Sequence, residues 1–193
     1  MIPLLEFVGE VTAKVVVKKA IDYGIDKSFD FVGKNFLGDD EEDEGDSKLG
    51  KEIFDIINYE PTILNYTNDK YCAKIIKSKL IEKCSEYDEI DLDYFEGFIS
   101  GVKGVVKMRR TIFDILKYNP NMIKRSDSSI KKQIYDNLEV DEESKEYLSQ
   151  EIDRVKTIFK SYKKGKSPKE IYEDIFVFEF ETAQFIKIFN RVS

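Results

Sequence analysis

A thirty-residue run with helical spacing, Asp91 to Pro120, constrains the fold of this chain more than any other feature. Asp91 stands where a helix N-cap belongs, and Pro120 ends the run because the residue before a proline avoids helical geometry. At about 100° per residue, the apolar and charged side chains fall on opposite sides of this helix. Because an apolar arc of this width must be buried, we predict one long helix on which the other segments pack. The arc comprises Tyr94, Phe98, Val102, Val105, Ile112, Phe113 and Leu116.

Arg109 is the one charge that falls in the middle of this apolar arc. Burying a guanidinium without a partner is very costly. We therefore expect Arg109 to form a buried ion pair with a carboxylate. The alternatives are that its stem lies along the apolar surface while its head reaches water, or that it binds a ligand.

Three glycines, Gly97, Gly101 and Gly104, lie on or beside one stripe of the same helix. Each costs about 1 kcal/mol of helix propensity relative to alanine. The stripe predicts that another helix passes close to this one, with the N-terminal region as the expected partner, and a glycine hinge is the alternative.

The remaining chain predicts further helices and no sheet, so we expect an all-α, single-domain bundle of about seven helices. Residues 2–37 are helical by spacing, as one helix or as two that break near Gly24. Ser167 and Glu170 form a capping box around Pro168, which predicts the start of the last helix. Residues 176–181 also alternate like a strand, and we interpret them as helix because no second strand is evident. Further expected caps are Thr67 or Asn68, Ser126 and Asp141.

Charge is distributed unevenly along the chain, whose net charge is −7. Seven acids occupy eight positions near residue 40, and we expect residues 39–47 to be a mobile acidic loop because like charges repel. This loop is the candidate contact for a basic partner protein. Its acids are Asp39, Asp40, Glu41, Glu42, Asp43, Glu44 and Asp46.

A basic stretch between residues 103 and 132 is the candidate contact for phosphate or nucleic acid. The simpler interpretation is a solvated face that balances acidic neighbours. Apart from Arg109, its basic residues are Lys103, Lys107, Arg110, Lys117, Lys124, Arg125, Lys131 and Lys132.

The chain has no histidine, which excludes Ser-His and Cys-His nucleophiles, histidine bases and His-containing zinc sites. We find no phosphate-binding glycine loop, and we expect no cofactor, no metal and no catalytic residue. A magnesium site formed by carboxylates is the one alternative to the expectation of no metal. Glu170, Asp174 and Glu181 would share a side of the last helix and could hold a magnesium ion.

The two cysteines, Cys72 and Cys84, would lie about 18 Å apart on one helix. This separation is too large for a disulfide, so we expect free thiols and a cytoplasmic location. We also expect no signal peptide and no membrane span.

These observations favour a non-enzymatic protein-binding module, such as an acidic inhibitor or an immunity-type protein that masks a basic partner. The alternatives are a nucleic-acid-binding regulator that uses residues 103–132, and a helical enzyme that uses carboxylates and a metal.

Overall fold

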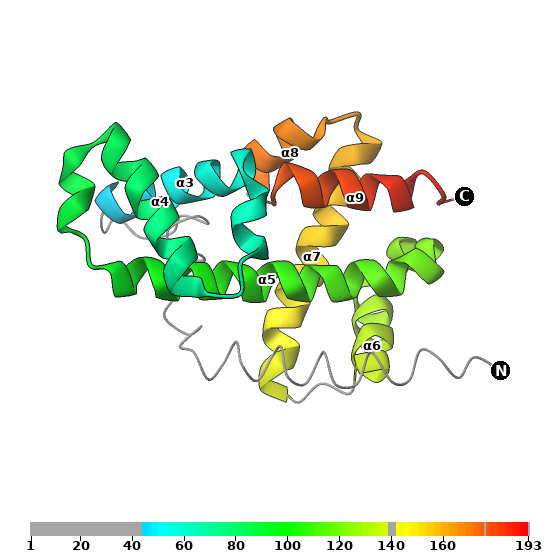
Figure 1. The fold of residues 1–193 in the computed structure, drawn as a ribbon. Coiled ribbons are helices and arrows are strands. Elements are labelled where there is room, and N and C mark those ends of the chain that lie inside the picture. Colours follow the sequence, from blue (N-terminus) through cyan, green and yellow to red (C-terminus); the bar gives the residue numbers. More distant parts are fainter. Residues whose placement is uncertain (1–43, 139–141, 176, 193) are drawn as a thin grey trace. The chain divides into compact units, whose positions relative to one another are not determined.

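The computed structural model describes residues 44–138, 142–175 and 177–192, and this part of the chain is helical. It contains seven α-helices, three short 3-10 helices and no strand, which confirms the all-α prediction (Figure 1). None of the described helices is long and apolar enough to cross a membrane. The α-helices are α3 (Glu44–Tyr59), α4 (Asp69–Lys83), α5 (Leu92–Tyr118), α6 (Asp127–Leu138), α7 (Glu142–Lys163), α8 (Pro168–Ile175) and α9 (Glu179–Phe189). The 3-10 helices are η1 (Pro61–Asn65), η2 (Ser85–Glu89) and η3 (Pro120–Lys124).

The chain divides into two compact units, and the division falls inside α5, between Lys103 and Gly104. We call residues 44–103 the N-terminal unit and residues 104–192 the C-terminal unit. Two compact units can belong to one folding domain or to two, so the expected single domain stays a prediction.

The N-terminal unit consists of α3, η1, α4, η2 and the first part of α5. Its interior is apolar because α3, α4 and α5 each turn one face of buried residues inward. Phe54 of α3 meets Phe98 of α5 edge to face, with ring centroids 5.7 Å apart. The fully buried residues of this unit are Ile53, Ile57, Cys72, Ala73, Ile76, Leu80, Phe95 and Ile99.

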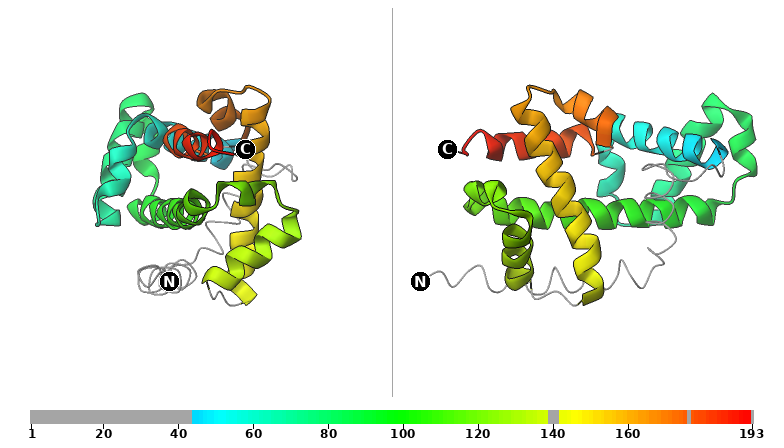
Figure 2. Two further views of the ribbon diagram at one scale, coloured as in Figure 1. Left: turned by 90° about the vertical axis from the view of Figure 1, so that its right-hand side faces the viewer. Right: turned by 180° about the vertical axis from the view of Figure 1, so that it is seen from behind.

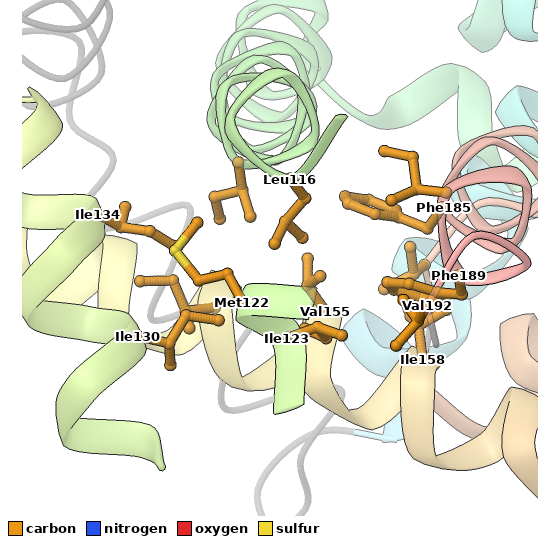
Figure 3. Packing of buried hydrophobic residues seen from close by; sticks show 14 of the residues in the cluster. Leu116, Met122, Ile123, Ile130, Ile134, Val155, Ile158, Phe185, Phe189 and Val192 are labelled. Carbon is orange, nitrogen blue, oxygen red and sulfur yellow. The ribbon is translucent and has the colours of Figure 1, made fainter. Parts of the chain in front are cut away.

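The C-terminal unit consists of the second part of α5, then η3 and α6 to α9. Helices α6 and α7 lie side by side and run in opposite directions (Figures 1 and 2). One apolar cluster fills this unit, and its side chains converge from α5, η3, α6, α7 and α9 (Figure 3). Residues at the centre of the cluster include Leu116, Met122, Ile134, Val155, Ile158, Phe185 and Phe189.

Three of the expected helix starts are capped by the predicted side chains. Asn68 Oδ1 accepts a hydrogen bond from the Tyr71 N–H at the start of α4, at 3.0 Å. Asp91 accepts one from the Asp93 N–H at the start of α5, at 3.2 Å. At the start of α8, the Ser167 N–H donates to Glu170 Oε2 at 2.8 Å and the Glu170 N–H donates to Ser167 Oγ at 3.3 Å, as in a capping box.

The last helix was predicted as one element, and this prediction is wrong. The structure has two helices, α8 and α9, separated by non-helical backbone at Val177 and Phe178. Aromatic and β-branched residues are weak helix formers. Leaving the helix here allows the side chains of both Val177 and Phe178 to be fully buried. The choice of helix over strand is correct from Glu179 onward.

The predicted end of the acidic loop at residue 47 is wrong. Helix α3 begins at Glu44, so residues 44–47 are helical. Acidic residues at a helix N-terminus are favourable because they complement the helix dipole. Residues 39–43, and with them most of the predicted loop, lie outside the described residues. The predicted N-terminal helical region, residues 2–37, lies outside them as well.

Two glycines occupy different local environments. The stripe of Gly97, Gly101 and Gly104 was predicted to contact the N-terminal region, which lies outside the described residues. Within the part of the chain that the structure describes, a Cβ atom added at Gly97 would meet no atom within 4 Å. Gly165 follows α7 with a positive φ of 84°. The Gly165 N–H donates to the Tyr162 carbonyl and the Lys166 N–H to the Ser161 carbonyl, the two bonds of a Schellman motif.

The two glycines should therefore respond oppositely to alanine. Gly97→Ala should stabilise the protein by about 0.5 to 1 kcal/mol, because alanine favours the helix and has room. Gly165→Ala should destabilise it by about 1 to 2 kcal/mol, because alanine is strained at positive φ. Urea unfolding of both variants tests this pair. Destabilisation by Gly97→Ala would show that the glycine stripe is in close contact after all.

Candidate functional site

Arg109 forms an ion cluster with two carboxylates inside the C-terminal unit. Its side chain is 2% exposed, while Glu151 and Glu181 are 0% and 5% exposed. Arg109 Nε donates to Glu181 Oε1 at 2.9 Å, and Nη2 donates to Glu181 Oε2 at 2.7 Å. Arg109 Nη1 donates to Glu151 Oε2 at 3.0 Å. The guanidinium is therefore shared between a bidentate partner on α9 and a second carboxylate on α7.

Each member of this cluster lies on the apolar face of its own helix. Glu151 follows Leu148 by three residues and precedes Val155 by four, and both of those residues are buried. Glu181 lies three residues after Phe178 and four before Phe185, which are also buried. The helical-wheel argument that singled out Arg109 also marks Glu151 as an acid on an apolar face, whereas the prediction of one long last helix placed Glu181 on an outer face.

Burial and charge act against each other in this cluster. Burial by itself lowers the pKa of Arg109, but the charges of Glu181 and Glu151 outweigh it, and the pKa is raised above its ordinary value. Burial raises the pKa of Glu181, and the charge of Arg109 offsets part of that rise. Arg154, which is partly buried, places Nε 3.4 Å from the second oxygen of Glu151. The raised pKa of Arg109 favours its charged form, which is the form that both carboxylates bind.

The cluster is built to connect helices rather than to bind a ligand. Both carboxylates are engaged by arginine, and none of the three side chains is open to solvent. Removing one partner of such a cluster leaves a buried charge without compensation, which is strongly destabilising.

A second feature is an ordered acidic surface in the N-terminal unit. It follows η2 into the start of α5, and we call it the acidic run. Its members, all exposed, are Glu86, Asp88, Glu89, Asp91 and Asp93.

Two side chains hold the backbone of the acidic run in place. Lys77 of α4 donates from Nζ to the carbonyl oxygens of Asp88, at 2.8 Å, and Ile90, at 2.7 Å. Tyr87 of η2 donates to Glu52 of α3. Because these bonds anchor the backbone between the exposed acids, the carboxylates project from a fixed support.

The basic residues predicted to contact nucleic acid are only partly exposed. Lys107, Arg110, Lys117, Lys124 and Lys132 are exposed. Arg125 is exposed as well and bonds Gln133, while the half-buried Lys103 and Lys131 pair with Asp69 and Asp153. The ion pairs made by Lys103 and Lys131 agree with the simpler interpretation of a face that balances acidic neighbours.

The carboxylates considered for magnesium do not form a site. Glu170 belongs to the capping box at the start of α8, and Asp174 pairs with Lys166. Glu181 lies on a different helix, where it binds Arg109. Among the described residues, no group of three or more acids or thiols is arranged to hold a metal ion.

No family model, no curated protein and no solved structure matches this chain.

The ion cluster predicts a specific pattern of stability changes. Arg109→Met should lower the free energy of unfolding by about 3 to 5 kcal/mol, because two buried carboxylates lose their cation. Replacing Arg109, Glu151 and Glu181 together with methionine should recover most of this loss, because the buried charges are then absent. Denaturant titration of the single and triple variants measures both effects. A single variant as stable as wild type, or a triple variant no better than the single one, would contradict the cluster.

The anchor of the acidic run predicts a pH dependence. Burial, followed by the hydrogen bond to Glu52, raises the pKa of Tyr87 from 10.0 to about 12. A raised pKa stabilises the folded state fully below pH 10.0, and this contribution is lost as the pH rises through about 12. The stability advantage of wild type over Tyr87→Phe should therefore be constant near neutral pH and shrink across that window. Unfolding measured in parallel at each pH tests this, and a difference that stays constant through pH 12 would contradict the anchor.

Proposed function

We propose that this chain is a non-enzymatic protein-binding module that recognises a basic partner protein, as an acidic inhibitor or immunity-type protein does. The observation that carries the proposal is the ordered acidic run, in which exposed carboxylates project from a backbone held by Lys77 and Tyr87. Because this backbone is already ordered, the chain loses less conformational entropy on binding than a flexible acidic tail would.

The distribution of charge along the chain supports the same proposal. Residues 20–103 include 10 basic and 21 acidic residues, a net charge of −11. Residues 104–193 include 18 basic and 15 acidic residues, a net charge of +3. The acidic excess is thus concentrated in the part of the chain that contains the acidic run. A concentrated charge of one sign attracts partners of the opposite sign and accelerates their association.

The cytoplasm is the compartment that suits this proposal. Cys72 and Cys84 are both free thiols, and thiols stay reduced in the cytoplasm. The acids predicted to contact a basic partner near residue 40 belong to the proposal on their sequence alone, because residues 39–43 lie outside the described residues.

The test compares two variants that change the net charge equally. Glu86→Gln/Glu89→Gln removes two carboxylates from the acidic run and leaves Asp91, which caps α5, in place. Asp136→Asn/Glu146→Gln removes two exposed carboxylates from the C-terminal unit. Each protein is used to capture partners from the native cell, and bound proteins and nucleic acids are both identified.

We expect a basic protein that wild type and the control variant retain and that the Glu86→Gln/Glu89→Gln variant loses. With the purified partner, this variant should associate roughly tenfold more slowly at low salt and approach wild type at high salt, because steering is screened. Equal loss of the partner in both variants would reject the acidic run as the binding surface. Retention of nucleic acid alone would favour the regulator that uses residues 103–132.

A further inference from the structure

The N-terminal unit holds a thiol against a primary amine. Cys72 lies in the first turn of α4, and its side chain is fully buried. Lys103 reaches it from α5, and the Lys103 Nζ atom lies 3.3 Å from Cys72 Sγ. The two residues are 31 positions apart in the sequence, so the fold creates this contact.

Other contacts hold both reactive atoms in position. Lys103 Nζ is 2.6 Å from Asp69 Oδ1 and 2.5 Å from the Tyr66 carbonyl oxygen. Cys72 Sγ is 3.3 Å from the Ile63 carbonyl oxygen, to which the thiol donates. The amine therefore has the sulfur on one side and a carboxylate that can accept its proton on another.

We propose that Cys72 and Lys103 form a reversible covalent cross-link, a sulfenamide, when the protein is exposed to hydrogen peroxide. In the first step, peroxide transfers one oxygen atom to Cys72 Sγ. The sulfur loses two electrons, the O–O bond breaks, and a sulfenic acid and one water form. The ammonium group of Lys103 beside the sulfur stabilises the negative charge that develops there during this step.

In the second step, Lys103 transfers a proton to Asp69 and its lone pair attacks Sγ. The S–O bond breaks, the hydroxyl takes a further proton from the attacking nitrogen and leaves as water, and an N–S bond replaces the S–O bond. Thiol, amine and one peroxide thus give the sulfenamide and two waters. Dithiothreitol reverses the reaction because a thiolate attacks the sulfur and releases the amine.

The cross-link would change the N-terminal unit in two ways. It would join α4 covalently to α5, next to the point where the two units divide. It would also remove the positive charge of Lys103, so that Asp69 loses its partner and the unit becomes more acidic.

The experiment uses full-length wild type and a Cys84→Ser variant. In this variant Cys72 is the only cysteine, so an internal disulfide cannot form. Both proteins are treated with hydrogen peroxide, remaining thiols are blocked, and peptides are mapped by mass spectrometry. The expected product is one peptide pair that joins Cys72 to Lys103 and is lighter than its parts by two hydrogen atoms. Dithiothreitol should separate the pair.

Two lysine variants provide matched controls. Lys103→Arg keeps a positive charge beside Asp69 but lacks the primary amine, so it should give oxidised Cys72 without a joined peptide. Lys74→Arg changes an exposed lysine on α4 and should still give the joined peptide. Three results would each overturn the proposal. In wild type and Cys84→Ser, Cys72 could be recovered only as free thiol or as sulfur acids. A joined peptide could form in Lys103→Arg, or Cys72 could be joined to a different lysine.

Discussion

The buried ion cluster around Arg109 is the interaction on which the C-terminal unit depends. Three charged side chains lie on the apolar faces of α5, α7 and α9, and each would be very unfavourable there alone. Together they compensate one another's charge, because one guanidinium donates to both carboxylates, although Glu151 Oε1 accepts no hydrogen bond from the described residues and lies 3.4 Å from Arg154 Nε. Apolar contacts tolerate small shifts of one helix along another, whereas these hydrogen bonds require one alignment. We infer that the cluster selects the register in which the three helices pack.

The described structure uses charge in two different ways. The Arg109 cluster is withdrawn from water and organises the interior of the C-terminal unit. The acidic run does the opposite, because Lys77 and Tyr87 hold its backbone while its carboxylates stay in solvent. Exposed carboxylates change the free energy of unfolding little. Because they stay in solvent, they remain available to a partner. The proposed recognition of a basic protein follows from this second use of charge.

Much of the local structure could be predicted from the sequence because its causes are local. Helical spacing gave the all-α class and the long helix α5, and short polar side chains gave the caps at Asn68, Asp91 and Ser167. The position of Arg109 on an apolar arc indicated a buried charge. Its partners could not be assigned, because Glu151 and Glu181 lie 42 and 72 positions away in the sequence.

The errors have a common physical origin, which is that tertiary packing overrides local pattern. The apolar spacing after Ser167 predicted one helix. In the structure the helix is interrupted at Val177 and Phe178, and both of these side chains are fully buried. Glu181 was therefore placed on an outer face with Glu170 and Asp174, whereas it lies inside and binds Arg109. The acidic run was not predicted, because acidic residues are denser near residue 40 and density was the signal used. The sequence also does not show that Lys77 binds and orders the backbone of the run.

The most direct test of the ion cluster is side-chain NMR of the five arginines in wild type and in Glu181→Gln. A buried guanidinium that donates to two carboxylates should show an Nε–H signal that exchanges slowly with water and hindered rotation about its Nε–Cζ bond. We predict that Arg109 gives such a signal in wild type, and that Glu181→Gln accelerates its exchange while the exposed Arg110 is unchanged. Rapid exchange at Arg109 in the folded wild-type protein would contradict the account.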